Sequence, residues 1–106
     1  MQIAIDDGGS TATITMVGRL DITGAEVIAL PLATLSGSKN ALVVDMAGVT
    51  FIASIGLRHL VSAAKAVGRR GGRLVLRNPS AAVAEVITTS GLGDLLLIES
   101  NDAPQS

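Results

Sequence analysis

The sequence predicts an α/β domain with the element order ββαβαβαβ, in which helices pack mainly on one face of a mixed β-sheet. Two observations lead to this fold class. Residues 2–6 and 11–17 form two candidate strands around the turn Asp7-Gly8-Gly9-Ser10, and the second alternates apolar and polar residues with period two. Downstream, short apolar runs alternate with segments whose apolar residues recur at helical spacing, which is typical of strands joined by crossover helices.

The first helix is expected over residues 24 to about 36. Thr23 and Glu26 have the spacing of a capping box, which satisfies free backbone N–H groups at a helix start. Pro31 lies inside this range and predicts a kink or two short pieces, because proline lacks the N–H and clashes with the preceding turn. An apolar run at 41–46 is then typical of a strand buried on both faces, and residues 47–53 are expected to form a loop.

A second helix is expected after this loop, with Arg58, His59, Ser62, Lys65 and Arg69 on its polar side and an inner face of Leu57, Leu60, Val61, Ala64 and Val67. Gly71-Gly72 ends it, and residues 73–77 form the next strand. Pro79 fits the first turn of a third helix that ends at Gly91-Leu92, with Val83, Val86, Ile87 and Ser90 inward. The last strand is expected at 95–98. Residues 1–100 thus form one domain, and the polar tail 101–106 is expected to fray.

Composition excludes several classes of protein. Of 106 residues, 48% are hydrophobic but Phe51 is the only aromatic, so the stacking platforms of nucleic-acid and sugar sites are missing and nucleic acid is not an expected partner. The chain has no cysteine and one histidine, so we expect no disulfide, no metal site and no cofactor. It shows neither a signal peptide nor a membrane-spanning run, and a cytoplasmic location without membrane insertion is expected.

No catalytic constellation is recognisable. The aspartates are scattered among strand ends and turns, and no spacing brings two of them to one helical face as an acid/base pair. His59 is expected to face solvent, and the Gly8-Gly9 and Gly71-Gly72 pairs suit a turn and a helix end better than a phosphate loop. We therefore expect a binding protein with no catalytic residues.

One segment, Val49 to Leu57, carries apolar residues through an expected loop into a helix, and Ser54 lies where that helix begins. A simple interpretation makes Ser54 an N-cap, worth about 1 kcal/mol. That role does not account for Ile52, Ile55 and Gly56 around it. Together these residues favour a small hydroxyl displayed amid apolar surface that another protein can cover.

The stretch from Asp45 to Leu57 resembles the signature of STAS domains, the anti-sigma factor antagonist family. The resemblance extends to Gly18-Arg19-Leu20-Asp21, to the strand Gly71-Gly72-Arg73-Leu74-Val75-Leu76, and to the helix end Ser90-Gly91-Leu92. It covers about residues 3 to 98 in the right order, so it implies a STAS-type mixed sheet.

The resemblance implies a bacterial, partner-switching regulator of transcription. Such a protein binds an anti-sigma factor that is also a serine kinase, frees the sigma factor, and is inactivated by phosphorylation. Ser54 matches the phosphoacceptor, Asp21 a nearby residue of the kinase-facing surface, and Gly56 the glycine of the helix start. The expected partner-binding set is Asp21, Thr23, Ile52, Ala53, Ser54, Ile55, Gly56 and Arg58. A serine phosphatase is a further possible partner, and the chain is expected to be a monomer or a weak dimer.

Ala53 and Ile55 depart from the pattern of many relatives, which carry an acidic residue and a smaller residue at these positions. They leave open a STAS domain that acts as a constitutive structural partner in a transporter or sensory complex, with Ser54 serving only as an N-cap. A third interpretation, a small-ligand or nucleotide-binding protein or a minor hydrolase, would use Asp21 and Ser54 around a shallow pocket.

Overall fold

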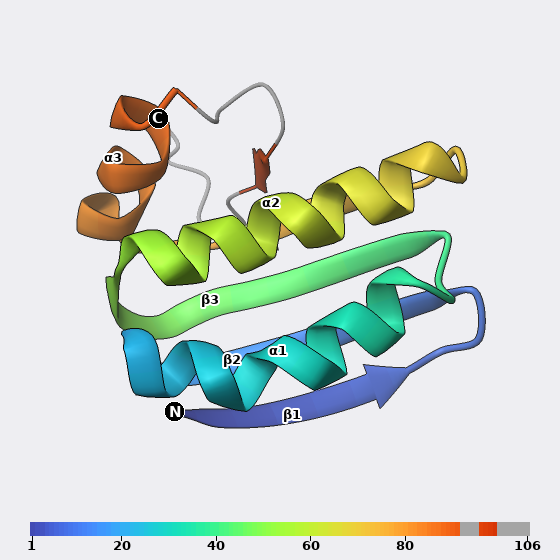
Figure 1. Cartoon of the computed structure of the whole chain (residues 1–106), viewed down its shortest axis with the longest axis horizontal. Helices are drawn as coiled ribbons and strands as arrows, with labels where there is room; N and C mark the ends of the chain where they lie inside the picture. Colours follow the sequence, from blue (N-terminus) through green and yellow to red (C-terminus); the bar gives the residue numbers. More distant parts are fainter. Residues whose placement is uncertain (92–95, 100–106) are drawn as a thin grey trace.

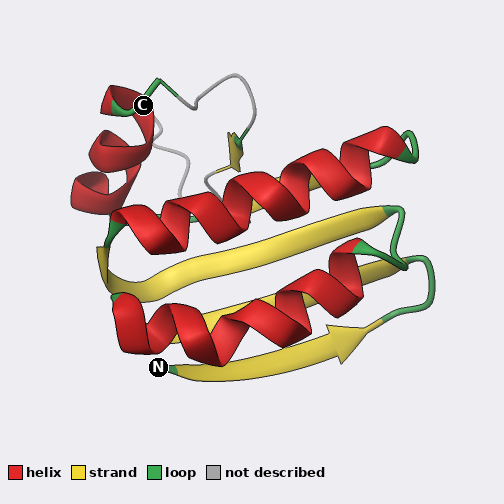
Figure 2. Ribbon diagram, viewed as in Figure 1, coloured by secondary structure: helices red, strands yellow, loops and turns green. Residues whose placement is uncertain are grey.

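The computed structural model of this chain describes residues 1–91 and 96–99. Its elements are shown in Figure 1 and, coloured by type, in Figure 2. In chain order they are β1 (Gln2–Asp7), β2 (Thr11–Leu20), α1 (Ile22–Ser36), β3 (Ala41–Ile52), α2 (Ser54–Arg69), β4 (Arg73–Arg77), α3 (Ala81–Thr89) and β5 (Leu97–Glu99). This is the predicted ββαβαβαβ order.

The strands form a single five-stranded sheet in the order β1-β2-β3-β4-β5. β1 pairs with β2 antiparallel through the hairpin, and every later neighbouring pair is parallel. α1 and α2 lie side by side across one face of this sheet, while α3 lies near the carboxyl end of β3 (Figure 1). The predicted fold class, a mixed sheet with helices mainly on one face, is confirmed.

The core lies between the sheet and the two long helices and is entirely aliphatic. Alternate residues of the three central strands point into it, and each of these is at most 2% exposed: Ala12, Ile14, Met16, Leu42, Val44, Met46, Leu74 and Leu76. Ile28 and Leu32 of α1 and Leu60 and Val67 of α2 cover them. On the opposite face, Val43 and Asp45 are half-buried because no helix covers them, so β3 is not fully buried on both faces.

The expected loop at 47–53 is wrong, because β3 continues without a break to Ile52. Its parallel neighbour β2 extends to Leu20, and the pairing continues to Leu20 opposite Ile52 through two irregularities of register. The strand partners of Gly48, Val49, Phe51 and Ile52 thus lie more than thirty positions away in the sequence. The apolar character of this segment reflects a strand, not an unusual loop.

The expected start of the first helix is also wrong. α1 begins at Ile22, and its N-cap is Asp21, whose Oδ1 accepts a hydrogen bond of 2.9 Å from the Gly24 N–H. Thr23 therefore lies exposed within the first turn and does not cap the helix. The helix is continuous through Pro31, so two separate pieces do not form. The core contacts of Ile28 and Leu32 hold both sides of the proline to the sheet.

The last helix begins one residue after its N-cap Ser80, whose hydroxyl accepts the Val83 N–H at 3.2 Å. Val83 and Ile87 are buried as predicted, but Val86 is 41% exposed and Ser90 is exposed, so these two do not belong to the inner face. Gly91 has a positive φ of 81°, as expected at a helix end. Leu92, Leu95 and the tail 101–106 lie outside the described residues, and the observed last strand is Leu97–Glu99.

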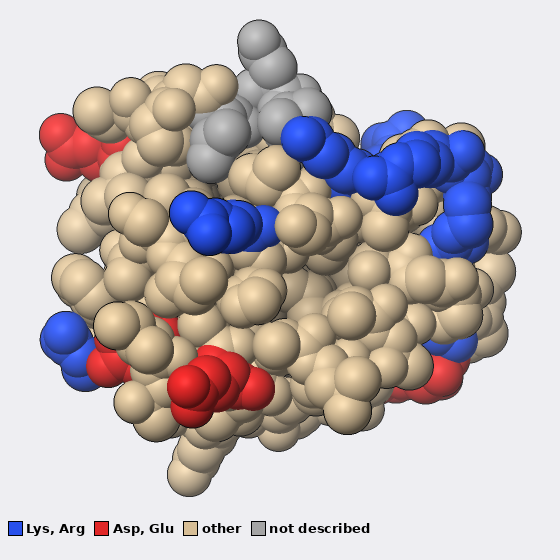
Figure 3. All heavy atoms as spheres, viewed as in Figure 1, with Lys and Arg blue, Asp and Glu red and all other residues tan. Residues whose placement is uncertain are grey.

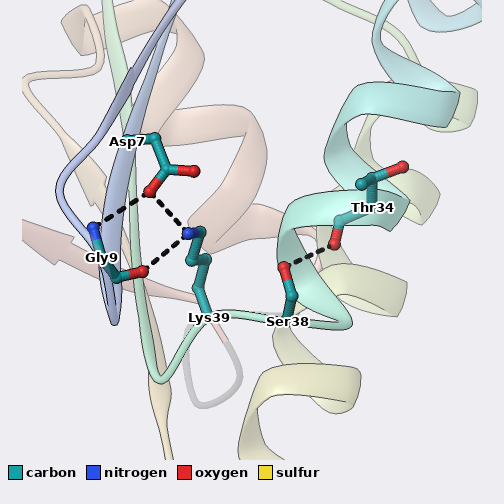
Figure 4. Close-up of polar contacts among 5 residues, drawn as sticks. All are labelled: Asp7, Gly9, Thr34, Ser38 and Lys39. Carbon is teal, nitrogen blue, oxygen red and sulfur yellow. Dashed lines mark hydrogen bonds and ion pairs between the residues drawn. The ribbon is translucent and has the colours of Figure 1, made fainter.

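At the amino ends of the parallel strands, three connections are tied together by polar contacts. The Lys39 ammonium lies 2.6 Å from both the Asp7 carboxylate and the Gly9 carbonyl oxygen (Figure 4). Arg70 donates to the carbonyls of Ser36 and Lys39. A Cβ on Gly72 would meet the Asn40 carbonyl oxygen at 1.9 Å, so glycine is required there. This end of the sheet is held rigidly by its own contacts.

Candidate functional site

The carboxyl ends of β2 and β3 lie next to each other and bring the starts of two helices together. Leu20 pairs with Ile52, and the Ala53 N–H donates to the Leu20 carbonyl at 2.9 Å. The chain then enters α1 after Leu20 and α2 after Ala53. Asp21 and Ser54 consequently lie at the same end of the sheet, the end at which open α/β sheets commonly bind their ligands.

Ser54 is the first residue of α2 and its side chain is exposed. The N-cap of α2 is Ala53, which has no side chain able to cap, so the interpretation of Ser54 as an N-cap is wrong. Within residues 1–91 and 96–99, the Ser54 hydroxyl has no hydrogen-bond partner. A reactive enzyme group can therefore approach it from solvent.

Gly56 sets the position of this serine. A Cβ at Gly56 would lie 2.6 Å from Leu20 Cγ and 3.2 Å from the Leu20 carbonyl oxygen. The first distance is far too short for a real contact and the second is tight, so glycine allows the first turn of α2 to approach the end of β2 this closely. The expected role of Gly56 at the helix start thus has a physical basis in the described contacts.

The carboxylate of Asp21 is used within the chain. One oxygen caps α1 through Gly24, and the other lies 3.6 Å from Nε of Arg19. The hydrogen bond from the Gly24 N–H lowers the pKa of Asp21 below its ordinary value, and the backbone N–H of Asp21 itself and the nearby Arg19 charge act in the same direction. Asp21 is therefore a structural anion at neutral pH, although its side chain remains 38% exposed.

The other expected partner-binding residues separate into two groups. Ile52 is 5% exposed and belongs to the core, so it is not part of the surface around Ser54. Ala53 and Ile55 are half-buried, whereas Arg58 is exposed one turn after Ser54. A shallow hollow of about 430 Å³ runs beside this turn and is lined by Ser54, Leu57, Arg58, Val61, Ser62, Lys65 and Ser90. Asp21 does not line it, so these two residues do not share the shallow pocket of the third interpretation.

The charged groups near this hollow are cations. Figure 3 shows Lys and Arg side chains over α2 and gathered at its C-terminal end, whereas an acidic side chain lies over α1. α2 has no acidic residue in its first turn. The hydroxyl of Ser54 thus lies in surroundings that favour negative charge, between the start of a sixteen-residue helix and Arg58.

One feature of this end of the molecule was not predicted from the sequence. The Arg19 guanidinium lies over the Phe51 ring, with 4.4 Å between its central carbon and the ring centroid. Arg19 pairs with Phe51 across β2 and β3, and both side chains are exposed. The sequence shows only that Phe51 is a lone aromatic in an apolar segment. It does not give the register of β2 and β3, which places Arg19 opposite this ring.

The described residues contain neither a membrane-spanning helix nor a cluster of metal ligands. No helix there combines the length and the apolar character that a membrane span requires. No group of three or more His, Cys, Asp or Glu side chains in residues 1–91 and 96–99 is arranged to hold a metal ion.

Residues 3–99 match the model of the family described as "Mlab, STAS domain". Since the match spans nearly the whole chain, this protein belongs to the STAS domain family. A search of curated protein sequences found no match.

Solved structures of anti-sigma factor antagonists are similar to the fold. The antagonist SpoIIAA in its unphosphorylated form has a TM-score of 0.79 and 23% identity, with 95% of this chain and 90% of that chain covered. An anti-sigma factor antagonist from Mycobacterium paratuberculosis has a TM-score of 0.80 and 22% identity over 92% and 84%. The likeness extends to SLC26A9, with a TM-score of 0.70, 18% identity and coverage of 85% of this chain but 18% of that one. At these identities the likeness shows a shared fold.

Proposed function

We propose that this chain is an anti-sigma factor antagonist that works by partner switching and is inactivated by phosphorylation at Ser54. The observation that carries the proposal is the exposed, unbonded Ser54 hydroxyl at the first residue of α2, within the described part of the chain. The fold shared with unphosphorylated SpoIIAA and other antagonists supports it. The expected partners are an anti-sigma factor with serine kinase activity and a serine phosphatase.

In the proposed reaction, Ser54 Oγ attacks the γ-phosphorus of an ATP bound to the kinase. The Oγ–H proton passes to a base of the kinase, the bond to the β,γ-bridging oxygen breaks, and ADP leaves. The chain supplies only the acceptor. Its contribution is position, because Gly56 and the Ala53–Leu20 hydrogen bond hold the start of α2 against the end of β2.

The phosphorylated domain should remain folded. Phosphoserine adds close to two negative charges at the positive end of the α2 dipole, one turn from Arg58. This arrangement stabilises the helix, by at most about 2 kcal/mol. No acidic residue of the first turn opposes it.

Binding to the covering partner is affected differently. A dianion buried beneath a partner that offers no matching cation costs several kcal/mol, and each 1.4 kcal/mol corresponds to about a tenfold change in affinity. A loss of about a hundredfold or more is therefore expected. Since the same modification leaves the fold intact, it acts as a switch on binding alone.

The test uses a candidate anti-sigma factor kinase, a histidine-kinase-like ATPase chosen from the genes that neighbour the one for this chain. Incubation with this ATPase and ATP should add the mass of one phosphoryl group to the wild type and none to Ser54→Ala, as measured by intact mass spectrometry. By calorimetry, Ser54→Ala should bind like the unmodified wild type and Ser54→Asp about a hundredfold more weakly. Ser10→Asp, at an exposed serine at the opposite end of the sheet, is the matched control and should bind normally. Equal binding by Ser54→Ala and Ser54→Asp would refute the switch.

A constitutive structural partner is the second candidate function. The observation that favours it is the likeness to SLC26A9, where the matched part covers 18% of a much longer chain. In this case the binding surface would be covered permanently and Ser54 would never be modified. An unchanged mass after incubation with the kinase, together with tight binding by both Ser54 variants, would favour this function.

A further inference from the structure

We propose that Arg19 is a partner-binding residue, held by Phe51 and Asp21 so that its guanidinium receives a carboxylate of the same partner that covers Ser54. This inference rests on the proposed function and names the chemistry of the contact. It arises from a side-chain arrangement at the carboxyl ends of β2 and β3, where sequence reasoning had assigned the contact to Asp21.

The carboxylate of Asp21 is already engaged on both oxygens. Oδ1 accepts the Gly24 N–H at 2.9 Å, and Oδ2 lies 3.6 Å from Arg19 Nε. These contacts use part of the acceptor capacity of the carboxylate and hold it against α1 and Arg19. Asp21 is thus better suited to positioning Arg19 than to binding a partner itself.

Arg19, in contrast, has donors left over. A guanidinium carries five N–H groups in a rigid fork. Within residues 1–91 and 96–99, Arg19 forms one ion pair, with Asp21 through Nε. Its side chain is 61% exposed. The outer edge of the fork therefore faces solvent, with the planar geometry that accepts a carboxylate through two parallel hydrogen bonds.

Two contacts restrict the orientation of Arg19 in the free protein. The guanidinium lies 4.4 Å from the centroid of Phe51, and stacking on the ring restricts its plane. Asp21 holds the Nε side. Long cationic side chains normally lose considerable rotamer freedom on binding, and these two contacts reduce that loss for Arg19. Preorganised arginine beside an aromatic ring is also the composition typical of interface hot spots.

The surface next to this pair is apolar. Phe51 is 39% exposed and borders a small hollow of about 90 Å³, whose other lining residues are Thr50, Ile52, Ala82, Val83 and Val86. Val86, which was expected to be buried, is instead exposed here. A partner segment that places an acidic residue on Arg19 can thus set an aliphatic side chain beside Phe51.

This surface lies at the same end of the sheet as the proposed Ser54 interface. Arg19 and Phe51 are paired one position before the pair Leu20 and Ile52, and Ser54 follows Ile52 by two residues. A partner that covers the end of β3 meets both. The positive charges of Arg19 and Arg58 favour an acidic segment of the partner at this surface. A basic segment is repelled by the same two side chains.

The experiment measures the affinity of the neighbouring ATPase for Arg19→Ala, Arg19→Lys and Phe51→Leu by calorimetry at two salt concentrations. Arg19→Ala should bind about thirtyfold more weakly, and Arg19→Lys about tenfold, because lysine keeps the charge but not the planar fork. Phe51→Leu should weaken binding as well. The matched control is Arg73→Ala, an exposed arginine at the other end of the same sheet face, which should bind like the wild type.

The outcomes separate this inference from the proposed function. Normal binding by Arg19→Ala overturns the inference even if the Ser54 variants switch as proposed. Weak binding by Arg19→Ala with equal binding by Ser54→Ala and Ser54→Asp retains the inference and overturns the switch. If the wild type does not bind the ATPase, both fail. Thermal unfolding of each variant must show a folded protein, which is expected because both side chains are exposed.

Discussion

Gly56 and Leu20 approach each other so closely that a methyl group at Gly56 would overlap the Leu20 side chain at 2.6 Å. Leu20 is fully buried and cannot move aside, and its carbonyl is committed to the Ala53 N–H. The contact joins the end of β2 to the first turn of α2. The position of Ser54 therefore depends on a packing contact with a residue 34 positions earlier in the sequence.

Gly56→Ala should destabilise the domain by about 1–3 kcal/mol, because overpacking outweighs the roughly 1 kcal/mol gained from the better helix propensity of alanine. Gly68→Ala is the matched control in the same helix, where a Cβ would meet nothing within 4 Å. It should stabilise the domain by about 0.5–1 kcal/mol. Urea unfolding of both variants measures the difference, and destabilisation by both would contradict the packing argument.

Acid should weaken the domain through Asp21. The hydrogen bond from the Gly24 N–H lowers the pKa of this carboxyl in the folded state, so its contribution is present above the unfolded-state pKa near 3.8 and is lost as pH falls through the lower folded pKa. Asp21→Asn keeps a good N-cap but does not titrate. Its urea midpoint should fall less than that of the wild type between pH 5 and about pH 2. Parallel pH profiles for the two proteins would exclude this role.

Negative charge at position 54 should stabilise the isolated domain. Ser54→Asp places a carboxylate at the start of α2, and about 0.3–1 kcal/mol of stabilisation is expected at low ionic strength. Salt should reduce this gain, since the group is exposed. Urea unfolding at low and high salt, with Ser54→Asn as an uncharged control, measures it. A lower stability of Ser54→Asp than of Ser54→Asn would contradict the dipole argument.

Lys39→Met should lower stability without affecting partner binding. The substitution removes the two contacts of the Lys39 ammonium, with Asp7 and with the Gly9 carbonyl oxygen (Figure 4). The hydrogen bond from Lys39 lowers the pKa of Asp7, with a further contribution from the Gly9 N–H, so in Lys39→Met the acid sensitivity below pH 4 should diminish. Urea titrations at pH 7 and pH 3 test stability, and calorimetry with the neighbouring ATPase tests binding. Weakened binding would show that the two ends of the sheet are coupled.

The order of elements was predictable because each has a local signature. Strict alternation marked β2, apolar periodicity marked α2, and Gly71 has the positive φ that a helix end requires. The start of α2 at Ser54 was also correctly located. The bounds of β4, Arg73–Arg77, were correct as well, because Gly71-Gly72 and Asn78-Pro79 mark both ends of this strand in the sequence.

The errors arose where distant segments decide the structure. The length of β3 depends on its parallel pairing with β2. The sequence of residues 47–52 contains no signal that identifies β2 as the pairing strand. The sequence predicted Thr23 as the cap of α1, but β2 ends at Leu20 and the helix begins directly after Asp21, which caps it. The stacking of Arg19 on Phe51 likewise follows from a register across two parallel strands.

The contacts of Lys39, Arg70 and Gly72 join the connections at one end of the sheet. Residues at the opposite end take no part in these contacts. Because these contacts lie away from the proposed recognition surface, substitutions of its exposed side chains, such as Arg19 and Arg58, are expected to leave them undisturbed. Duplicated copies of this protein can therefore diverge at these exposed positions while they keep the fold. Among paralogues of this chain, we expect the residue to vary most at positions 19, 51 and 58. Position 72 should remain glycine.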